Sequence, residues 1–203
     1  MTEGTAGNAP TDHRVPAAQV PLAMVQLGDQ QLVLEPLTAD AFNPFGDVIE
    51  ATDAAKHFTI NQGFAERFDR LAHVDVAQDG GQAAISIFRA KARPQPLQLT
   101  MLEKHPLGSQ AFMPLSGQPY LVVVALGADQ PDLKSLRCFA ATGQQGVNYA
   151  KGTWHHPLLA LHDSNFLVLD RAGVKGEENC VAYLLSALDE ANSPLQHRQT
   201  LDL

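Results

Sequence analysis

Residues 103–117 read EKHPLGSQAFMPLSG, and this stretch decides the fold. Two short runs typical of β-strands flank the turn-forming tripeptide Pro106-Leu-Gly108. Residues two apart on an extended strand point the same way, so Glu103 and His105 share a face. Gln110 opens the next run, from which its amide can face back toward them. A carboxylate, an imidazole and an amide oxygen are possible ligands for a divalent metal such as nickel, manganese, iron or zinc.

A second histidine-bearing stretch, GVNYAKGTWHHP, spans residues 146–157. Gly152 marks a turn, after which the chain enters a strand that contains His155. Adjacent residues of a strand point to opposite sides, so only one of His155 and His156 can line a given pocket. We expect Trp154 to pack beside that pocket.

Short β-type runs separated by Gly, Pro, Asp and Asn make up most of the remaining chain. They cover residues 47–50, 84–90, 96–102, 110–115, 120–126, 136–140, 165–170 and 180–185. Only residues 38–42 read as a helix, with the threonine at their start as its N-cap. The pattern predicts an all-β fold, a β-sandwich or barrel with one or two short helices. If no bulge interrupts the run that leads to Glu103, Leu97, Leu99 and Met101 share its face.

The length of 203 residues suits a single domain. We expect residues 1–30 to form a flexible extension, residues 31–188 the domain and residues 189–203 a tail. Cys138 and Cys180 lie far apart in the sequence, which excludes a thiolate zinc cluster and a disulfide framework.

The charge pattern restricts the partners of the protein. The formal net charge is −8 and no basic stripe is present, which argues against nucleic-acid binding and against docking on an anionic membrane. No apolar run approaches the ~20 residues that span a bilayer. The N-terminus lacks the basic start and apolar stretch of a signal peptide, so we predict a cytoplasmic protein.

The two histidine stretches resemble the paired motifs of cupins, whose first motif has the form H-x-H-x4-E-x6-G. Glu103 and His105 stand at the positions of the two histidines, Gln110 replaces the glutamate, and Gly117 closes the motif. The second motif, G-x-x-H, matches residues 152–155. The resemblance implies a cupin-like, jelly-roll type of β-sandwich or barrel. It also implies a pocket around the histidines in which two of the usual metal ligands are exchanged for weaker ones.

Several longer strings, in the same order, resemble the ureidoglycolate lyase family over about residues 31–186. They are FGDVIE at 45–50, INQG at 60–63 followed by Arg67, HPLGSQAFMP at 105–114, VVVAL at 122–126, QGVNY at 145–149 and WHHP at 154–157. The resemblance implies a lyase that cleaves (S)-ureidoglycolate to glyoxylate and urea, late in allantoin and purine breakdown. It also implies nickel as the metal. Because β-sandwich cupins often pair through edge strands, we further expect a homodimer.

Cleavage of ureidoglycolate requires a base for the hydroxyl proton, an acid for the departing nitrogen and a cation near the carboxylate. We expect Glu103, His105 and His155 to be catalytic. With Gln110, they either hold a divalent metal or form a metal-free polar pocket. The expected substrate-binding residues are Arg67 and Arg89 for the carboxylate, Asn61, Gln62 and Asn148 for the urea end, Gln110, and Tyr120 for proton transfer.

Two alternatives to a ureidoglycolate lyase remain open at this point. A non-catalytic cupin that binds a small carboxylate as a sensor would tolerate weak ligands at two positions. Another cupin enzyme, such as an isomerase or a dioxygenase, is the second alternative, because a fold does not fix a function. Turnover with release of urea distinguishes the lyase from both.

Overall fold

The computed structural model describes residues 23–173 and 179–185. The strands are β1 Val25–Leu27, β2 Gln30–Gln31, β3 Leu34–Pro36, β4 Gly46–Ile49, β5 His57–Ile60, β6 Ala65–Phe68, β7 Gln82–Ala90, β8 Leu97–Gln98, β9 Met101–Lys104, β10 Gln110–Pro114, β11 Tyr120–Ala125, β12 Arg137–Ala141, β13 Gly146–Tyr149, β14 Trp154–His155, β15 Leu159–Ala160, β16 Ser164–Ala172 and β17 Val181–Leu184. The helical elements of this part are α1 Ala39–Phe42 and the 3-10 turns η1 Asn61–Gly63, η2 Gln78–Gly80 and η3 Leu133–Ser135. The predicted all-β fold with few short helices is confirmed.

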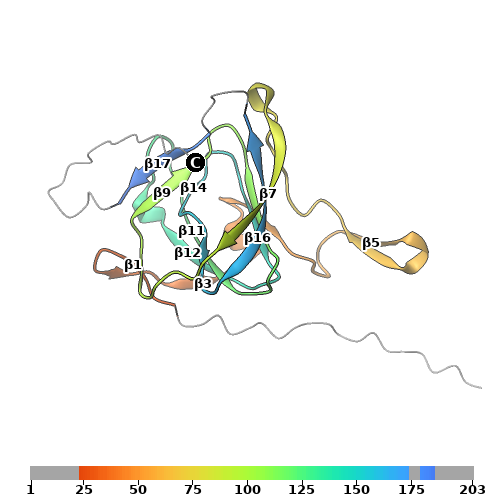
Figure 1. Cartoon of the computed structure of the whole chain (residues 1–203), viewed down its shortest axis with the longest axis horizontal. Helices are drawn as coiled ribbons and strands as arrows, with labels where there is room; N and C mark the ends of the chain where they lie inside the picture. The colour runs from red at the N-terminus through yellow and green to blue at the C-terminus, as the bar shows by residue number, and fades with distance from the viewer. Residues whose placement is uncertain (1–22, 174–178, 186–203) are drawn as a thin grey trace, which may run out of the picture.

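Two mostly antiparallel sheets form the body of the domain (Figure 1). One sheet has five strands in the order β4-β13-β10-β16-β7, and the other has seven in the order β17-β9-β14-β11-β12-β3, with β15 paired to β11. Alternate side chains of their strands meet in a shared apolar core. The residues of this core include Phe112, Val147, Phe166 and Val168 from the five-stranded sheet and Tyr120, Val122, Val124 and Phe139 from the other. The result is a two-sheet β-sandwich, as the sequence predicts.

A second apolar layer covers the other face of the seven-stranded sheet. The strand β1 pairs in parallel with β8, and Val25 joins Leu97 and Trp154 in one buried cluster. Val25 is completely buried, so the folded part begins before residue 31, the predicted start of the domain. Trp154 packs in this layer, as expected for a residue beside the histidines. Residues 1–22 and 189–203 lie outside the described part.

The chain between β8 and β9 breaks the regular strand that the sequence predicts for residues 96–102. The backbone N–H groups of Leu97 and Leu99 donate to the carbonyls of Met24 and Gln26, so this part follows β1. In contrast, β9 pairs with β14 and β17. The expectation that Leu97 and Leu99 share the face of Glu103 is therefore wrong, because both leucines are buried in the second apolar layer. Met101, two residues before Glu103 on β9, keeps the expected face.

The helix α1 begins after Thr38, as predicted. The Thr38 hydroxyl accepts a hydrogen bond from the backbone N–H of Ala41 at 3.2 Å. Phe42 then anchors the helix in the core, where its ring contacts those of Phe45 and Phe139. Within residues 23–173 and 179–185, no helix has the length and apolar character needed to cross a membrane.

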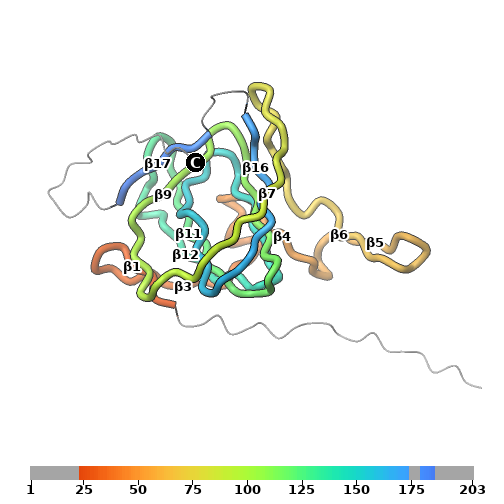
Figure 2. Tube along the Cα trace, viewed as in Figure 1, coloured from red at the N-terminus to blue at the C-terminus, as the bar shows by residue number. Residues whose placement is uncertain are grey.

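The strands β5 and β6 form a hairpin that projects from the body of the domain (Figure 2). At its turn, Asn61 and Gln62 have φ values of 50° and 59°, a region that residues other than glycine rarely adopt. Phe64, which follows, is 90% exposed. The hairpin therefore places polar and apolar side chains in solvent, away from the two sheets.

Candidate active site and metal centre

A cleft of about 820 Å³ is bounded by strands of both sheets. The five-stranded sheet contributes β7, β10 and β16, and the seven-stranded sheet contributes β9. The lining residues are Phe88, Arg89, Ala90, Lys91, Ala92, Arg93, Met101, Glu103, His105, Gln110, Phe112, Pro157, Leu158, Asp170, Arg171, Asn179 and Cys180. A space of this size admits a small polar metabolite.

Glu103, His105 and His155 form a cluster beside this cleft. In the antiparallel pair of β9 and β14, Glu103 lies directly opposite His155, so their side chains point to the same side. The distance from Glu103 Oε1 to His155 Nε2 is 3.5 Å. One ligand atom from each of the three residues lies within 4.8 Å of the others. The His105 and Glu103 side chains line the cleft, whereas His155 is only 1% exposed and lies outside the lining set.

Gln110 completes the predicted group of four. Its Oε1 position lies 3.1 Å from His105 Nε2, and the residue is 7% exposed on the wall of the cleft. The four residues that the sequence suggests as metal ligands thus come together in space. They come from β9, the turn that follows it, β10 and β14, and the sheet pairing brings these segments side by side.

Backbone carbonyls fix the tautomers of both histidines. The Nδ1 atom of His105 is 2.6 Å from the carbonyl oxygen of Asn179, and that of His155 is 2.9 Å from the carbonyl oxygen of Thr153. A carbonyl oxygen only accepts hydrogen bonds, so each Nδ1 carries the proton. In a neutral His155 ring, the Nε2 lone pair is then available for a metal or a proton, whereas Nε2 of His105 also contacts the Gln110 side-chain amide at 3.1 Å. Histidines that bind metals in proteins are oriented in the same way.

Burial and neighbouring charges set the protonation of the cluster. Desolvation lowers the pKa of His105, and the nearby His155 lowers it further, although Asn179, Glu103 and Gln110 act in the opposite direction. Burial alone would raise the pKa of Glu103. Interactions with His155, His105 and the Cys180 thiol outweigh that effect and lower the pKa below its ordinary value. At neutral pH the site therefore holds an ionised carboxylate beside a neutral His105.

Two residues outside the group of four hold the imidazoles in place. The Tyr149 ring stacks on His155 with a centroid distance of 4.1 Å and an interplanar angle of 12°. The backbone carbonyl of Asn179 accepts a hydrogen bond from His105 Nδ1–H. The side-chain Oδ1 of Asn179 accepts another from the Leu107 N–H, at 2.7 Å. The turn that carries His105 is thereby tied to the segment that leads into β17.

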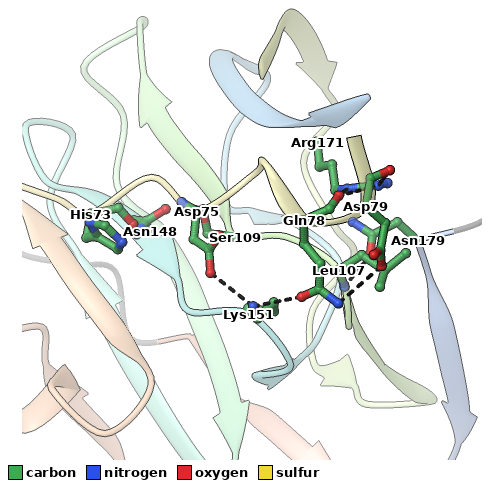
Figure 3. A network of polar contacts seen from close by, with 10 residues as sticks. All are labelled: His73, Asp75, Gln78, Asp79, Leu107, Ser109, Asn148, Lys151, Arg171 and Asn179. Carbon is green, nitrogen blue, oxygen red and sulfur yellow. Dashed lines mark hydrogen bonds and ion pairs between the residues drawn. The ribbon is translucent and has the colours of Figure 1, made fainter. Parts of the chain in front are cut away.

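A polar network ties residues 73–80 to Ser109, Lys151 and Arg171 (Figure 3). The Lys151 Nζ atom lies 3.1 Å from an Asp75 carboxylate oxygen and donates to the Gln78 side chain at 2.9 Å. Ser109 exchanges hydrogen bonds with the Asp75 backbone. Arg171, which lines the cleft, donates to the Gln78 carbonyl at 2.7 Å. These contacts hold the turn before β10 and the end of β16 in fixed positions.

The predicted cation Arg89 borders the cleft at its rim. The preceding residue, Phe88, faces inward, where its ring contacts Phe112. Alternation along β7 therefore places Arg89 on the opposite side, where it also borders a shallow depression that includes Asp163 and Asn165.

The structure does not place Asn61, Gln62 or Arg67 near the cluster in the same chain. All three belong to the hairpin of β5 and β6 and lie outside the lining of the cleft. Arg67 pairs instead with Asp69, with an Nη2–Oδ1 distance of 2.8 Å. Strings shared with a family mark similarity along the chain, and they do not show which of those residues meet in space.

Tyr120 and Asn148 also lie outside the cleft lining. The Tyr120 hydroxyl is buried in the core and donates to the Gln145 carbonyl at 3.0 Å. The Asn148 amide donates to an Asp47 carboxylate oxygen and to the His73 carbonyl, both at 2.9 Å. Both side chains therefore support the structure. His156 is buried too, with Nδ1 bonded to the Pro157 carbonyl, and it takes no part in lining the cleft.

Several polar residues of the cleft were not predicted from the sequence, among them Lys91, Arg93, Asp170 and Asn179. For Asp170 a signal existed, because it continues the alternation of Phe166 and Val168, which face the core. Arg93 lies in a loop without periodicity, so no local pattern could have assigned it to the cleft.

A sequence model described as "Ureidoglycolate lyase" matches residues 29–189. The chain belongs to the ureidoglycolate lyase family. A ureidoglycolate lyase from Pseudomonas syringae pv. syringae (strain B728a) is 56% identical over 145 residues, which cover 71% of this chain and 85% of the relative. The ureidoglycolate lyase of Burkholderia mallei (strain NCTC 10229) is 55% identical over 143 residues, covering 70% and 83%.

Among solved structures, Bacillus subtilis oxalate decarboxylase, a protein with Mn(II) centres, matches with a TM-score of 0.34 and 12% identity. That match covers 57% of this chain and 32% of the decarboxylase.

In this member of the ureidoglycolate lyase family, the donor set fits a divalent metal ion. The His155 Nε2 atom is buried, and among the described residues it has no hydrogen-bond partner. It lies 3.5 Å from a Glu103 carboxylate oxygen, so a cation or a proton between the two atoms would interact with both. Imidazole and carboxylate donors suit nickel, zinc, iron and manganese. The fit rests on Glu103, His105 and His155, with Gln110 at their side.

Proposed function

We propose that the protein is a lyase that cleaves ureidoglycolate to glyoxylate and urea. The observation that carries this proposal is the cluster of Glu103, His105 and His155 beside a cleft, in a chain of the ureidoglycolate lyase family. Family membership suggests the substrate. The cluster supplies the acid–base groups that the reaction requires.

The reaction moves one proton within the substrate. Ureidoglycolate carries a hydroxyl, a carboxylate and a ureido nitrogen on one carbon. The hydroxyl loses its proton, the C–N bond breaks with its electron pair on nitrogen, the C=O bond of glyoxylate forms, and nitrogen gains a proton to complete urea. Because hydroxyl and nitrogen share a carbon, one carboxylate can accept the first proton and deliver the second. Glu103 is ionised and lies on the wall of the cleft, so we assign this role to it.

His155 and His105 support the Glu103 carboxylate in different ways. His155 lies behind it, where it favours the ionised form. His105 lines the cleft and presents Nε2, since Nδ1 is held by Asn179. When bound at these residues, a divalent ion would lower the pKa of the substrate hydroxyl. We propose nickel as that ion on the basis of the family resemblance.

Binding of the substrate carboxylate requires a cation in the cleft. The segment from Arg89 to Arg93 borders the cleft and carries three basic side chains, with Lys91 between the arginines. Within the described ranges, Arg93 has no ion-pair partner, so its guanidinium is available for a bidentate contact with a carboxylate. We assign the substrate carboxylate to Arg93, with Arg89 at the rim.

We further propose that the protein forms a homodimer through the outer face of the five-stranded sheet. The strand β7 is at the edge of that sheet, and its Ile85 and Ile87 are 70% and 58% exposed. Their neighbours Leu167 and Leu169 in β16 extend the apolar surface. An exposed edge next to an apolar patch suits pairing with a second copy about a two-fold axis.

The experiment that tests the function follows three products separately. Purified protein is incubated with racemic ureidoglycolate, and glyoxylate, urea and ammonia are measured with and without EDTA. We expect glyoxylate and urea in equal amounts without ammonia. Glyoxylate formation at no more than the spontaneous rate, with nickel or manganese supplied, would exclude the lyase and favour a cupin that only binds its ligand.

A further inference from the structure

Asp170 is a carboxylate on the wall of the cleft that the proposed mechanism does not use. It lies on β16, where Phe166 and Val168 face the core, so alternation turns Asp170 to the same inner side. It belongs to the residues that line the cleft, and it is half-buried there. Its position is therefore fixed by a strand of nine residues, not by a loop.

The register of the sheet places Asp170 beside the cluster. Ala111 of β10 pairs with Leu169, so Gln110 and Asp170 follow as neighbours on adjacent strands. Gln110 in turn contacts His105 Nε2. Asp170 is nevertheless separate from the candidate metal ligands, because the close group of donor atoms consists of Glu103, His105 and His155. A second carboxylate thus faces the same space as the cluster.

Within the described part of the chain, no hydrogen bond or ion pair involves the Asp170 side chain. An ionised carboxylate only accepts hydrogen bonds, and it is costly to keep in a half-buried position without donors. Three of the basic side chains that line the cleft lie in the segment from Arg89 to Arg93, and the fourth, Arg171, donates to the Gln78 carbonyl. The cleft therefore offers a basic region and a separate acceptor.

The two ends of ureidoglycolate have complementary chemistry. One end is a carboxylate, which requires donors and positive charge. The other end is a ureido group, whose two N–H bonds lie parallel and form a fork toward a carboxylate, as a guanidinium does. We propose that Asp170 binds the ureido N–H groups and thereby selects ureido acids over other small hydroxy acids. The inference rests on the proposed function, and it assigns the ureido end of the same site.

The test compares two ligands that differ in the ureido group. N-carbamoylglycine carries a carboxylate and a ureido group, whereas glycolate carries a carboxylate and a hydroxyl. Binding of each to the metal-loaded protein is measured by calorimetry, for the wild type, Asp170→Asn and Asp170→Ala. We expect both variants to bind N-carbamoylglycine at least about tenfold more weakly, as for the loss of hydrogen bonds to a charged group. Glycolate should bind within about twofold of the wild type.

Asp129→Asn is the matched control, because Asp129 is exposed and does not line the cleft. It should leave both affinities unchanged. The inference is overturned if the Asp170 variants bind N-carbamoylglycine as the wild type does, or if they lose both ligands equally while remaining folded by circular dichroism. These measurements need no turnover. Failure of the proposed lyase would appear instead as wild-type protein that produces no glyoxylate.

Discussion

The Nε2 atom of His155 lies 3.5 Å from Oε1 of Glu103, and the side chains of both residues are mostly withdrawn from solvent. The antiparallel register of β9 and β14 sets this relationship, since it places the two residues directly opposite each other. Because Nδ1 of His155 contacts the Thr153 carbonyl, Nε2 is the ring nitrogen that faces Glu103. The pair is thus ready to share a cation or a proton.

Replacing Glu103 by glutamine should therefore remove the group that moves the substrate proton. We expect Glu103→Gln to lower kcat/KM for ureidoglycolate by about 10²–10⁴, the range for loss of general acid–base catalysis. Steady-state kinetics with glyoxylate detection measures this. Glu66→Gln, on the exposed hairpin, is the control and should retain wild-type kinetics. A Glu103→Gln variant with full activity would show that the base lies elsewhere.

Removal of metal should abolish activity if the cluster holds a divalent ion. We expect dialysis against EDTA to strip the protein of metal and activity, and nickel or manganese to restore both. Metal content is measured by elemental analysis. His105→Ala and His155→Ala should retain much less metal, whereas the exposed His162→Ala should retain the wild-type amount. Full activity in metal-free protein would leave the acid–base residues as the whole catalytic apparatus.

Acid should destabilise the fold through two histidines. Burial is the main cause that lowers the pKa of His105 and of His156 below the ordinary value of 6.5. Below pH 6.5 the unfolded chain takes up protons at these sites before the folded chain does, so the free energy of unfolding falls as the pH is lowered toward the folded pKa values. In that window each histidine lowers the free energy of unfolding by up to about 1.4 kcal/mol per pH unit.

Urea unfolding at about pH 7.5 and about pH 5.5 measures this dependence. We expect a smaller loss of stability between these two pH values for His156→Leu than for the wild type, because one of the two titrating groups is removed. The exposed His162→Leu should keep the wild-type dependence. An unchanged pH dependence in His156→Leu would show that His156 does not contribute.

Loss of the helix cap should cost stability without affecting catalysis. In Thr38→Ala the Ala41 N–H loses its side-chain acceptor, and we expect the free energy of unfolding to fall by about 1 kcal/mol. Thr38→Ser keeps a hydroxyl and should retain most of the stability of the wild type. Thr59→Ala, at an exposed position of the hairpin, serves as the control. A change in KM for Thr38→Ala would contradict the purely structural role of this helix.

The proposed dimer is tested by charges on the outer face of β7. We expect the Ile85→Lys and Ile87→Lys variants to be monomers where the wild type is a dimer, because either substitution would bury an unpaired charge in the proposed interface. Analytical ultracentrifugation measures the mass in solution. Val33→Lys, at a residue that is 80% exposed elsewhere on the surface, should leave the dimer intact. A monomeric wild type would refute the interface.

Much of the fold and part of the site could be predicted from local patterns. Alternation and turn residues located most strands, and the hydroxyl at Thr38 marked the start of α1. The two-residue spacing of Glu103 and His105 placed both on one face, and the structure keeps them there. In contrast, the break between β8 and β9 has no local signal, because pairing with β1, which is remote in the sequence, causes it.

The sequence by itself determined the all-β architecture, the helix cap and the shared face of Glu103 and His105, because each depends on the period of the backbone or on contacts within a few residues. Only the tertiary structure decided which polar residues meet. In that structure Arg67 lies on a projecting hairpin, Tyr120 is buried in the core, and Asp170 lines the cleft. The physical reason is that sheet register joins segments far apart in the chain, and no local pattern encodes that register.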